Sequence, residues 1–498
     1  MTGKRFLALA PLQIAQALIG FGAIAAFTRL MSPEEFGRYA LALSASMAAH
    51  TLLFTWAEAA AFRFFAAARA ERRLRDHYAT LLALVVCLGA AVLAATAALL
   101  FIVGLERDIA ALSAFAAAAA VFRFLTRITR ESDRAALEIG RFATLETVYI
   151  AIGFAAGIGF LVVADLGAAA PFAGLLLAGV IVALIDAPRL LARTRGGLVS
   201  PQRAFVYASY GAPLALALAV DLCVQTAARF LLAEQGGAAE LGAYAAAFGL
   251  ARPLDLVFMG AGAALSPLIL TAFETRGPEA ARAQAKQAFT LLIALAAPAA
   301  AGLALVATPL AALMIGEGLR TQAAAALPWL AAAGLISGFN VYYLSEAFQL
   351  TRRTGLRALV MLAPGAVQLT LTAWLAGAHG AAGAAIAAAA GAGVGAVLLT
   401  LVGRRLFALP LALGAIVRVG AATALMVCAV LMAPRGEGAA YFATDIAIGA
   451  AAYATGALIF NILDLRTRVS ALLQRLLAKV RAHLHSFFTD RAHVRLPW

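Results

Sequence analysis

Ionisable side chains inside long apolar segments are the residues of this sequence best suited to do chemistry. Arg252 lies well inside one such segment, and Pro253 and Asp255 follow it; Arg229 lies near the end of the preceding segment. A charge in an apolar span rarely faces lipid, because removing it from water is costly. Arg252 and Arg229 are therefore candidate cations for an anionic ligand. The alternatives are an i, i+3 pair between Arg252 and Asp255 and an Arg229 side chain that extends to the headgroups.

A second group of arginines lies at the expected inner ends of two apolar segments. Arg123, Arg127 and Arg130 are spaced i, i+4, i+7 and form a stripe on one helix face, and Arg63 has a similar place on an earlier helix. Arg123 and Arg63 are thus further candidates for contacting an anionic substrate at its point of entry. Anchoring to the anionic inner leaflet is the alternative for these residues.

Acids and a histidine within the apolar segments are candidates for coupling transport to H⁺ or Na⁺. They are Glu58, Asp221, Asp255, Glu346 and His50. Histidine titrates near neutral pH and carboxylates bind cations. A packed, hydrogen-bonded polar residue is the alternative for His50. The three cysteines all lie in apolar segments without a Cys/His cluster, so we expect no disulfide framework, no metal site and no cofactor.

The elements that position these residues must be membrane helices. The chain is 64% hydrophobic and 13% charged with a mean hydropathy of +0.91, whereas soluble domains have about 25% charged residues. A net charge of +14 is typical of cationic cytoplasmic loops in such a protein, so we expect no nucleic-acid partner. The sequence predicts an all-α polytopic membrane protein.

About 20 apolar residues span a bilayer, and the sequence contains fourteen such runs. They are 6–30, 38–62, 78–103, 109–129, 142–164, 170–190, 205–232, 242–270, 287–315, 322–348, 356–377, 380–402, 411–433 and 440–463. With both termini in the cytoplasm, 32 of the 39 Lys and Arg residues fall on the cytoplasmic side. This asymmetry predicts an even number of spans in that orientation.

A polar hairpin that occurs twice predicts an internal duplication. Residues 28–41, TRLMSPEEFGRYAL, read as a helix end at Leu30, a Ser32-Pro33 turn and a new helix opened by Glu34 and Glu35. Residues 35–40, EFGRYA, return 205 positions later as residues 240–245, ELGAYA. We therefore expect two six-helix lobes in parallel pseudo-twofold repeat, 1–203 and 204–403. Two extra helices in 404–465 and a basic amphipathic cytoplasmic tail in 466–498 would follow.

The two hairpins, TRLMSPEEFGRYAL and residues 241–255, LGAYAAAFGLARPLD, resemble the bacterial polysaccharide transporter family. That family includes the O-antigen and exopolysaccharide flippases and belongs to the multidrug/oligosaccharidyl-lipid/polysaccharide flippase superfamily. The resemblance implies a non-enzymatic protein of the bacterial inner membrane with a cationic central cavity that opens alternately to each side. It implies a polyprenyl-pyrophosphate-linked oligosaccharide as cargo, moved from the cytoplasmic to the periplasmic leaflet, and glycan polymerase or export proteins as possible partners.

Three other functions stay open at this point. A drug or cation antiporter of the same superfamily would have twelve helices and more acids than bases in its cavity. A membrane glycan polymerase or ligase would need a sizeable external loop, whereas every predicted outer loop here is short. A non-transporting scaffold for glycan synthesis would use the basic tail as a docking helix.

Overall fold

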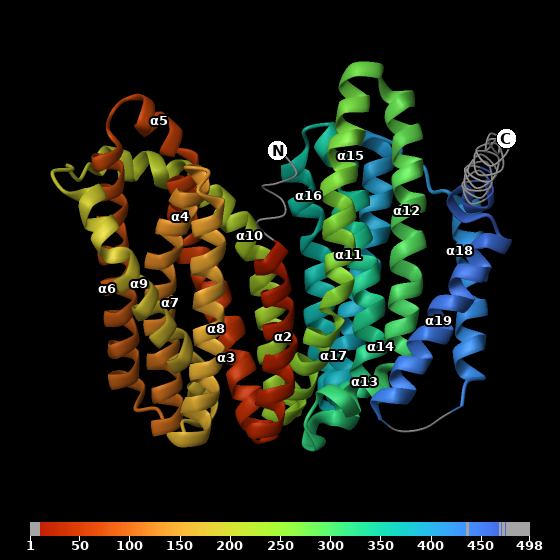
Figure 1. Ribbon diagram of the computed structural model, residues 1–498, viewed down its shortest axis with the longest axis horizontal. Coiled ribbons are helices and arrows are strands. Elements are labelled where there is room, and N and C mark those ends of the chain that lie inside the picture. The colour runs from red at the N-terminus through yellow and green to blue at the C-terminus, as the bar shows by residue number, and fades with distance from the viewer. Residues whose placement is uncertain (1–9, 435–437, 468–469, 471–473, 475–498) are drawn as a thin grey trace, which may run out of the picture. The chain divides into compact units, whose positions relative to one another are not determined.

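A computed structural model of the protein describes residues 10–434, 438–467, 470 and 474, and contains helices and no strand in that part of the chain (Figure 1). Twelve of the described helices are long and apolar enough to cross a membrane, and a bent helix pair raises the number to 13. The prediction of an all-α polytopic membrane protein is therefore confirmed. The count of fourteen spans stays a prediction.

The chain forms two compact units, which share three long helices. Of the described residues, unit 1 contains those within 1–252, 307–333 and 355–397, and unit 2 contains those within 253–306, 334–354 and 398–498. The shared helices are α11 (Ala238–Arg276), α14 (Glu317–Phe339) and α17 (Leu362–Leu406). The lobe boundaries expected from the duplication stay a prediction.

Unit 1 is an array of membrane helices and short connecting helices. Its remaining elements are α2 (Ala10–Leu30), α3 (Pro33–Leu53), α4 (Thr55–Arg63), α5 (Phe65–Ala70), α6 (Leu74–Val103), α7 (Arg107–Ala135), α8 (Ile139–Val163), the 3₁₀ turn η1 (Gly167–Ala169), α9 (Ala170–Thr194), α10 (Pro201–Gly236), α13 (Ala307–Met314) and α16 (Thr354–Val360). Those of unit 2 are α12 (Pro278–Leu305), the π-helical turn η2 (Asn340–Leu344), α15 (Glu346–Leu350), α18 (Leu413–Leu431), α19 (Ala439–Ile459) and the 3₁₀ turn η3 (Ile462–Asp464).

The first hairpin has the local structure that its sequence predicts. Helix α2 ends at Leu30, and Ser32 caps α3, which opens with Pro33. The Ser32 hydroxyl accepts the amide N–H of Glu35 at 3.2 Å, and the Glu35 carboxylate accepts the amide N–H of Ser32 at 2.8 Å. This reciprocal capping box satisfies two amides that a helix start otherwise leaves unpaired.

The two copies of the hairpin pack directly against each other within unit 1. A Cβ atom added to Gly37 would lie 1.8 Å from the carbonyl oxygen of Ala238, and one added to Gly242 would lie 2.9 Å from the carbonyl oxygen of Pro33. Gly242 and Ala238 follow Gly37 and Pro33 by the same 205 residues. Such exchanged contacts are those of a self-complementary interface about a twofold axis.

A second contact also occurs once in each copy of the hairpin, with almost the same offset in sequence between the two occurrences. Glu35 lies against Gly167, whose φ is +48°, and Glu240 lies against Gly380, whose φ is +51°. Glu240 also accepts the amide N–H of Ala381 at 2.7 Å. In both copies the glutamate of the hairpin meets a left-handed glycine that precedes a membrane helix, and a side chain at either glycine would collide with the carboxylate.

Helix α17 contains the predicted span 380–402 and all of the span 356–377 except its first residues, which lie in and just after α16. Its 45 residues would make a straight helix about 68 Å long, which is about twice the hydrocarbon thickness of a bilayer. The non-helical backbone at Gly380 divides it into two segments. The predicted amphipathic tail lies almost wholly outside the described residues and stays a prediction.

Candidate functional site

A break in the second membrane span brings His50 and Glu58 together. The sequence predicts one continuous span over 38–62, but α3 ends at Leu53 and α4 begins at Thr55, with a bend of 49°. His50 Nε2 lies 2.8 Å from Glu58 Oε1 across this break. In a straight helix the two residues would be about 12 Å apart along the axis. The bend thus places two of the ion-coupling candidates in direct contact.

The break has a tertiary cause, since no proline or glycine occurs between His50 and Glu58. Phe54 at the break is 1% exposed and stacks on Phe124 of α7, with ring centroids 4.3 Å apart and an angle of 10° between the planes. It also meets the His50 ring edge-on at 5.3 Å. Packing of Phe54 against α7 therefore positions the pair.

Arginines of α7 join this pair to a second buried carboxylate, Glu146 of α8. Arg127 Nε lies 3.6 Å from Glu58, whose side chain is 5% exposed. Arg123 and Arg130 pair with Glu146 at 2.7 and 2.8 Å, and the Arg130 side chain is 1% exposed. We call this group the Glu58–Glu146 cluster. Its members are His50, Glu58, Arg123, Arg127, Arg130, Glu131, Glu146 and Tyr149.

Tyr149 completes the cluster from α8. The guanidinium carbons of Arg123 and Arg130 lie 4.5 and 5.3 Å from the centroid of its ring. Arg127 also approaches Glu131 at 3.7 Å. Both ion pairs and cation–π contacts hold the arginine stripe toward the protein interior.

The arginine stripe of α7 is paired with carboxylates. Arg123, Arg127 and Arg130 each have a partner among Glu58, Glu131 and Glu146. Glu131 also pairs with a fourth arginine, Arg134, at 3.0 Å, and the Arg134 side chain is 47% exposed. A proton added to His50 would place a positive charge next to Glu58.

Arg229 and Arg252 form a separate cationic group in unit 1. The Arg229 guanidinium donates to the Ser44 hydroxyl of α3 and lies 5.0 Å from the centroid of the Phe248 ring. It also interacts electrostatically with Arg252. Arg229 is half-buried and Arg252 is exposed. Helix α11 continues through Pro253 without a break. Two like charges, on α10 and α11, are thus close enough to interact electrostatically.

Comparisons with known proteins assign the chain to a family. A family model described as "Polysaccharide biosynthesis protein" matches residues 2–273, which is more than half of the chain. The chain belongs to this family. No curated protein matches the sequence.

Solved structures show the fold of this member of the family. "Lipid II flippase MurJ, inward closed conformation" is similar with a TM-score of 0.73 at 12% identity, covering 92% of this chain and 99% of that one. An inward-facing "multidrug resistance MATE family transporter of the MOP superfamily" has a TM-score of 0.62 at 17% identity, covering 78% of this chain and 94% of that one. This member of the family is therefore a multi-pass membrane protein with a fold similar to those of the flippase and the MATE transporter.

The remaining candidates of this family member are not part of the Glu58–Glu146 cluster. Asp221 of α10 is exposed, accepts the Gln225 amide N–H at 2.9 Å and interacts electrostatically with Arg357. Arg63 is exposed, 6.0 Å from the centroid of the Tyr210 ring. Asp255 is also exposed, on the part of α11 that belongs to unit 2.

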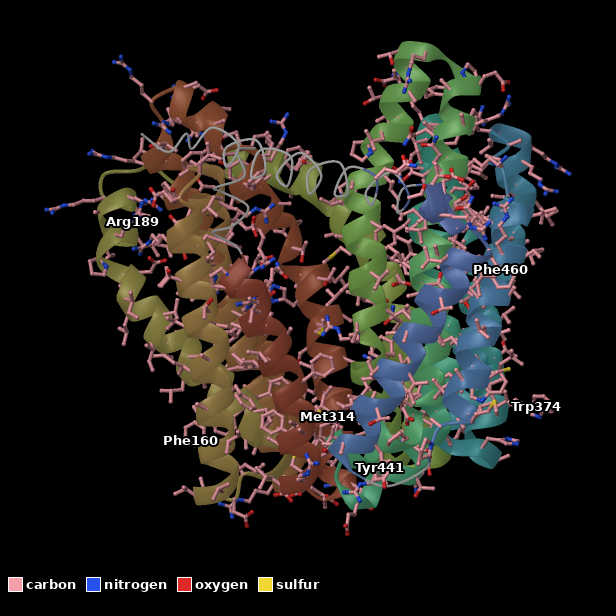
Figure 2. The ribbon with its side chains drawn as sticks, turned by 45° about the vertical axis from the view of Figure 1, so that its right-hand side comes forward. Phe160, Arg189, Met314, Trp374, Tyr441 and Phe460 are labelled. Atoms are coloured by element: carbon pink, nitrogen blue, oxygen red, sulfur yellow. The ribbon has the colours of Figure 1, made fainter. Side chains whose placement is uncertain are left out.

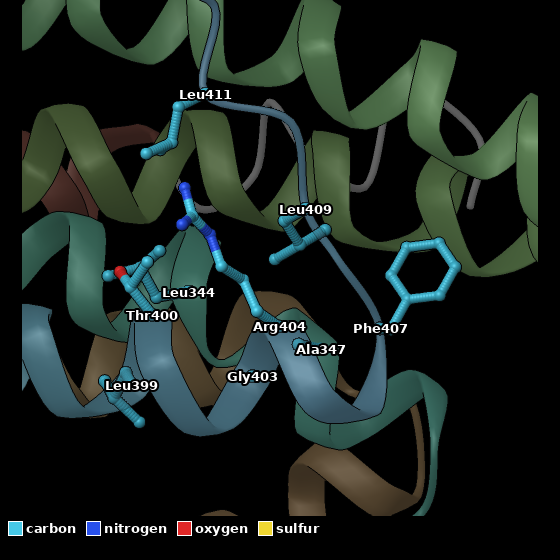
Figure 3. A pocket seen from close by; sticks show the side chains of 9 residues that line it. All are labelled: Leu344, Ala347, Leu399, Thr400, Gly403, Arg404, Phe407, Leu409 and Leu411. Atoms are coloured by element: carbon cyan, nitrogen blue, oxygen red, sulfur yellow. The ribbon is translucent and has the colours of Figure 1, made fainter.

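Glu346 lies in unit 2, where the chain departs from α-helical geometry. The Ser266 hydroxyl donates to the Glu346 carboxylate at 2.7 Å. In sequence, Glu346 comes shortly after the π-helical turn Asn340–Leu344. Such turns often occur at functional sites. A nearby hollow around Arg404 has a volume of about 10 Å³, which accommodates a single water molecule and no larger ligand (Figure 3).

Sequence reasoning missed Glu131, Glu146 and Tyr149. Glu146 is an acid within the predicted span 142–164, and this alone could have placed it among the candidates. Nothing in the sequence indicated that Glu146 pairs with arginines of α7. Among the described residues, no group of three or more His, Cys, Asp and Glu side chains is arranged to hold a metal ion.

A further charge network joins the ends of α7, α8 and α9. Asp133 pairs with Arg141 at 3.2 Å and with Arg193 at 3.1 Å, and Asp186 also pairs with Arg141. Arg189, which Figure 2 shows at the opposite end of this helix array from Phe160, donates to Glu138 at 2.6 Å. These pairs tie three helix ends together.

The Glu138–Arg189 pair predicts a small pH dependence of stability. The hydrogen bond from Arg189 lowers the pKa of Glu138 below its ordinary value. Because the folded-state pKa is depressed, the pair stabilises the protein above the unfolded value of about 4.3 and stops doing so as the pH falls through the folded value. Glu138→Gln should therefore lower stability at pH 7 by at most about 1 kcal/mol. Thermal denaturation in detergent should show this difference disappear at strongly acidic pH, and a constant difference would contradict it.

Proposed function

We propose that this protein is a flippase of the bacterial inner membrane that moves a polyprenyl-pyrophosphate-linked oligosaccharide to the periplasmic leaflet by alternating access. The family description and the flippase fold support a role in polysaccharide export. The observation that carries the cargo class is the group of Arg229 and Arg252. Two arginines near each other in an apolar protein suit a pyrophosphate, because guanidinium groups bind phosphate oxygens in a bidentate way.

The Glu58–Glu146 cluster fits the coupling step. His50 and Glu58 are joined across a broken span, and broken helices commonly form ion sites in transporters. Arg123 and Arg127 hold the carboxylates in this scheme and do not bind cargo. Protonation of His50 or Glu58 would change the charge of a buried group, and thereby favour one of two conformations.

Glu58→Gln should reduce transport at least about tenfold, which corresponds to about 1.4 kcal/mol of lost coupling. The amide keeps the size of the side chain and removes its charge and its ability to take up a proton. Export of surface glycan by cells that carry only the variant measures the effect. Glu106→Gln, an exposed acid before α7, is the matched control. Wild-type export by Glu58→Gln at normal protein levels would contradict the coupling role.

A drug or cation antiporter is the second candidate. The buried carboxylates of Glu58 and Glu146 and the similarity of the fold to a MATE transporter favour it. Dye efflux from cells that express the protein separates the two functions. Efflux that depends on Glu58, with unchanged surface glycan after deletion, would support the antiporter and contradict the flippase.

Depletion of the protein in its own host tests the cargo. Mass spectrometry should find a polyprenyl-pyrophosphate-linked glycan that accumulates within the cell while surface glycan declines. Depletion without such an intermediate would contradict the proposal.

A further inference from the structure

Unit 1 contains an open pocket lined by three arginines, one of which, Arg193, also belongs to the charge network at the ends of α7, α8 and α9. Arg69 of α5, Arg75 of α6 and Arg193 of α9 line it together with apolar side chains such as Phe65 and Leu74. Figure 1 shows α5 at one end of this unit. The pocket has a volume of about 490 Å³, which is within the usual range for a small-molecule site.

One of the three arginines is fixed by the protein, and two are available. Arg193 pairs with Asp133 at 3.1 Å, approaches Glu138 at 3.8 Å and lies 5.1 Å from the centroid of the Tyr78 ring. Arg69 and Arg75 are exposed and have no ion-pair partner in the described part of the chain. Glu138, the acid that lines the pocket, is already bound by Arg189. The pocket thus has a surplus of positive charge.

The backbone holds Arg69 and Arg75 in place on the two sides of a tight turn. The amide N–H of Arg73 donates to Ala68 at 2.8 Å, and Arg72 has a φ of +58°. This is the hydrogen-bond pattern that commonly ends a helix with a left-handed residue. Beyond the turn, a Cβ atom added to Gly197 would lie 2.2 Å from the carbonyl oxygen of Arg75.

A second contact fixes the start of α6. The amide N–H of Leu198 donates to the Asp76 carboxylate at 3.0 Å, and Arg203 pairs with the same carboxylate at 3.4 Å. The α9–α10 connection is therefore attached to the first turn of α6. Contacts within the protein therefore hold the backbone of Arg75 in position without a ligand.

We propose that this pocket binds the phosphate headgroup of a membrane lipid. Guanidinium groups match phosphate oxygens, and the apolar lining suits an amphiphile better than a free nucleotide. With both termini in the cytoplasm, as the charge distribution predicts, the pocket opens at the inner leaflet, where anionic headgroups concentrate. The phosphate belongs either to an anionic phospholipid or to the lipid carrier of the cargo. Only the second source rests on the proposed function.

Native mass spectrometry of the full-length protein in detergent tests the site. The probes are phosphatidylglycerol and polyprenyl pyrophosphate, with diacylglycerol and polyprenol as phosphate-free counterparts. The variant is Arg69→Gln/Arg75→Gln. Its matched control is Arg72→Gln/Arg73→Gln, which removes two exposed arginines of the same segment that do not line the pocket. Thermal denaturation of both variants checks that they are folded.

Loss of the pocket arginines should weaken binding of at least one phosphate lipid about tenfold or more. The control variant should bind nearly as the wild type does, and the phosphate-free lipids should bind all forms equally. A preference for phosphatidylglycerol assigns the pocket to a bilayer lipid, and a preference for polyprenyl pyrophosphate assigns it to the cargo carrier. Equal loss in both variants, or no loss in either, would overturn the site. That result would leave the transport proposal intact, because Arg229, Arg252 and Glu58 carry it.

Discussion

Replacing Gly37 with alanine should destabilise the protein by about 3 kcal/mol or more, at the upper end of the cost of overpacking. The added methyl carbon would lie 1.8 Å from the backbone oxygen of Ala238, which cannot rotate away as a side chain would. The two hairpins must then separate. Thermal denaturation in detergent and the yield of monodisperse protein measure the effect.

A series of glycine-to-alanine variants separates this contact from the general effect of the substitution. Gly242→Ala should be milder, because its methyl carbon would lie 2.9 Å from Pro33. Gly20→Ala has no atom within 4 Å and should be neutral or slightly stabilising, since alanine favours a helix by about 1 kcal/mol relative to glycine. If Gly37→Ala behaves as Gly20→Ala does, the hairpins do not pack in this way.

Glu146→Gln should cost about 3–5 kcal/mol, the usual penalty for removing one partner of a buried ion pair. The substitution leaves the guanidinium of Arg130 buried without a carboxylate and also releases Arg123. Gln keeps the shape of the side chain, so lost charge accounts for the effect. Loss of the folded fraction on heating in detergent is the measurement.

Glu279→Gln is the control for this variant. Glu279 also pairs with an arginine, Arg282, but its side chain is 86% exposed. Exposed pairs of this kind contribute about 0–1 kcal/mol, so the control should be close to wild type. Equal stability of the two variants would mean that the Glu58–Glu146 cluster is hydrated and is not a buried structural group.

The sequence predicts well those parts of the fold that depend on residues close to one another in the chain. The helix starts after the Ser32-Pro33 turn as predicted, because Ser32, Pro33 and Glu35, which form the helix start, lie within four residues of one another. Long apolar runs identify membrane helices because the bilayer sets their length and composition. The repeated glycine of the hairpin was visible in the sequence at Gly37 and Gly242, although their mutual contact was not.

The features that the sequence could not predict depend on packing between residues far apart in the chain. The break at Phe54 depends on its stacking with Phe124, which lies 70 positions later. The spacing of Arg123, Arg127 and Arg130 correctly predicts one helix face, but not the carboxylates that face it from α4 and α8. His50 and Glu58 were separate candidates in the sequence, and only the bent helix makes them one group.

Translocation by the purified protein is the most direct test of the proposed function. Proteoliposomes containing a polyprenyl-pyrophosphate-linked oligosaccharide would be treated with a glycosidase that cannot cross the membrane, so that only glycan on the outer leaflet is cleaved. Wild-type protein should make the inner-leaflet pool accessible, and Arg229→Gln/Arg252→Gln should slow this at least about tenfold. Arg107→Gln, which belongs to none of the charge groups described above, should act as the wild type does. An inner pool that stays protected with wild-type protein, or equal rates for the wild type and the double variant, would contradict a flippase that holds its cargo at Arg229 and Arg252.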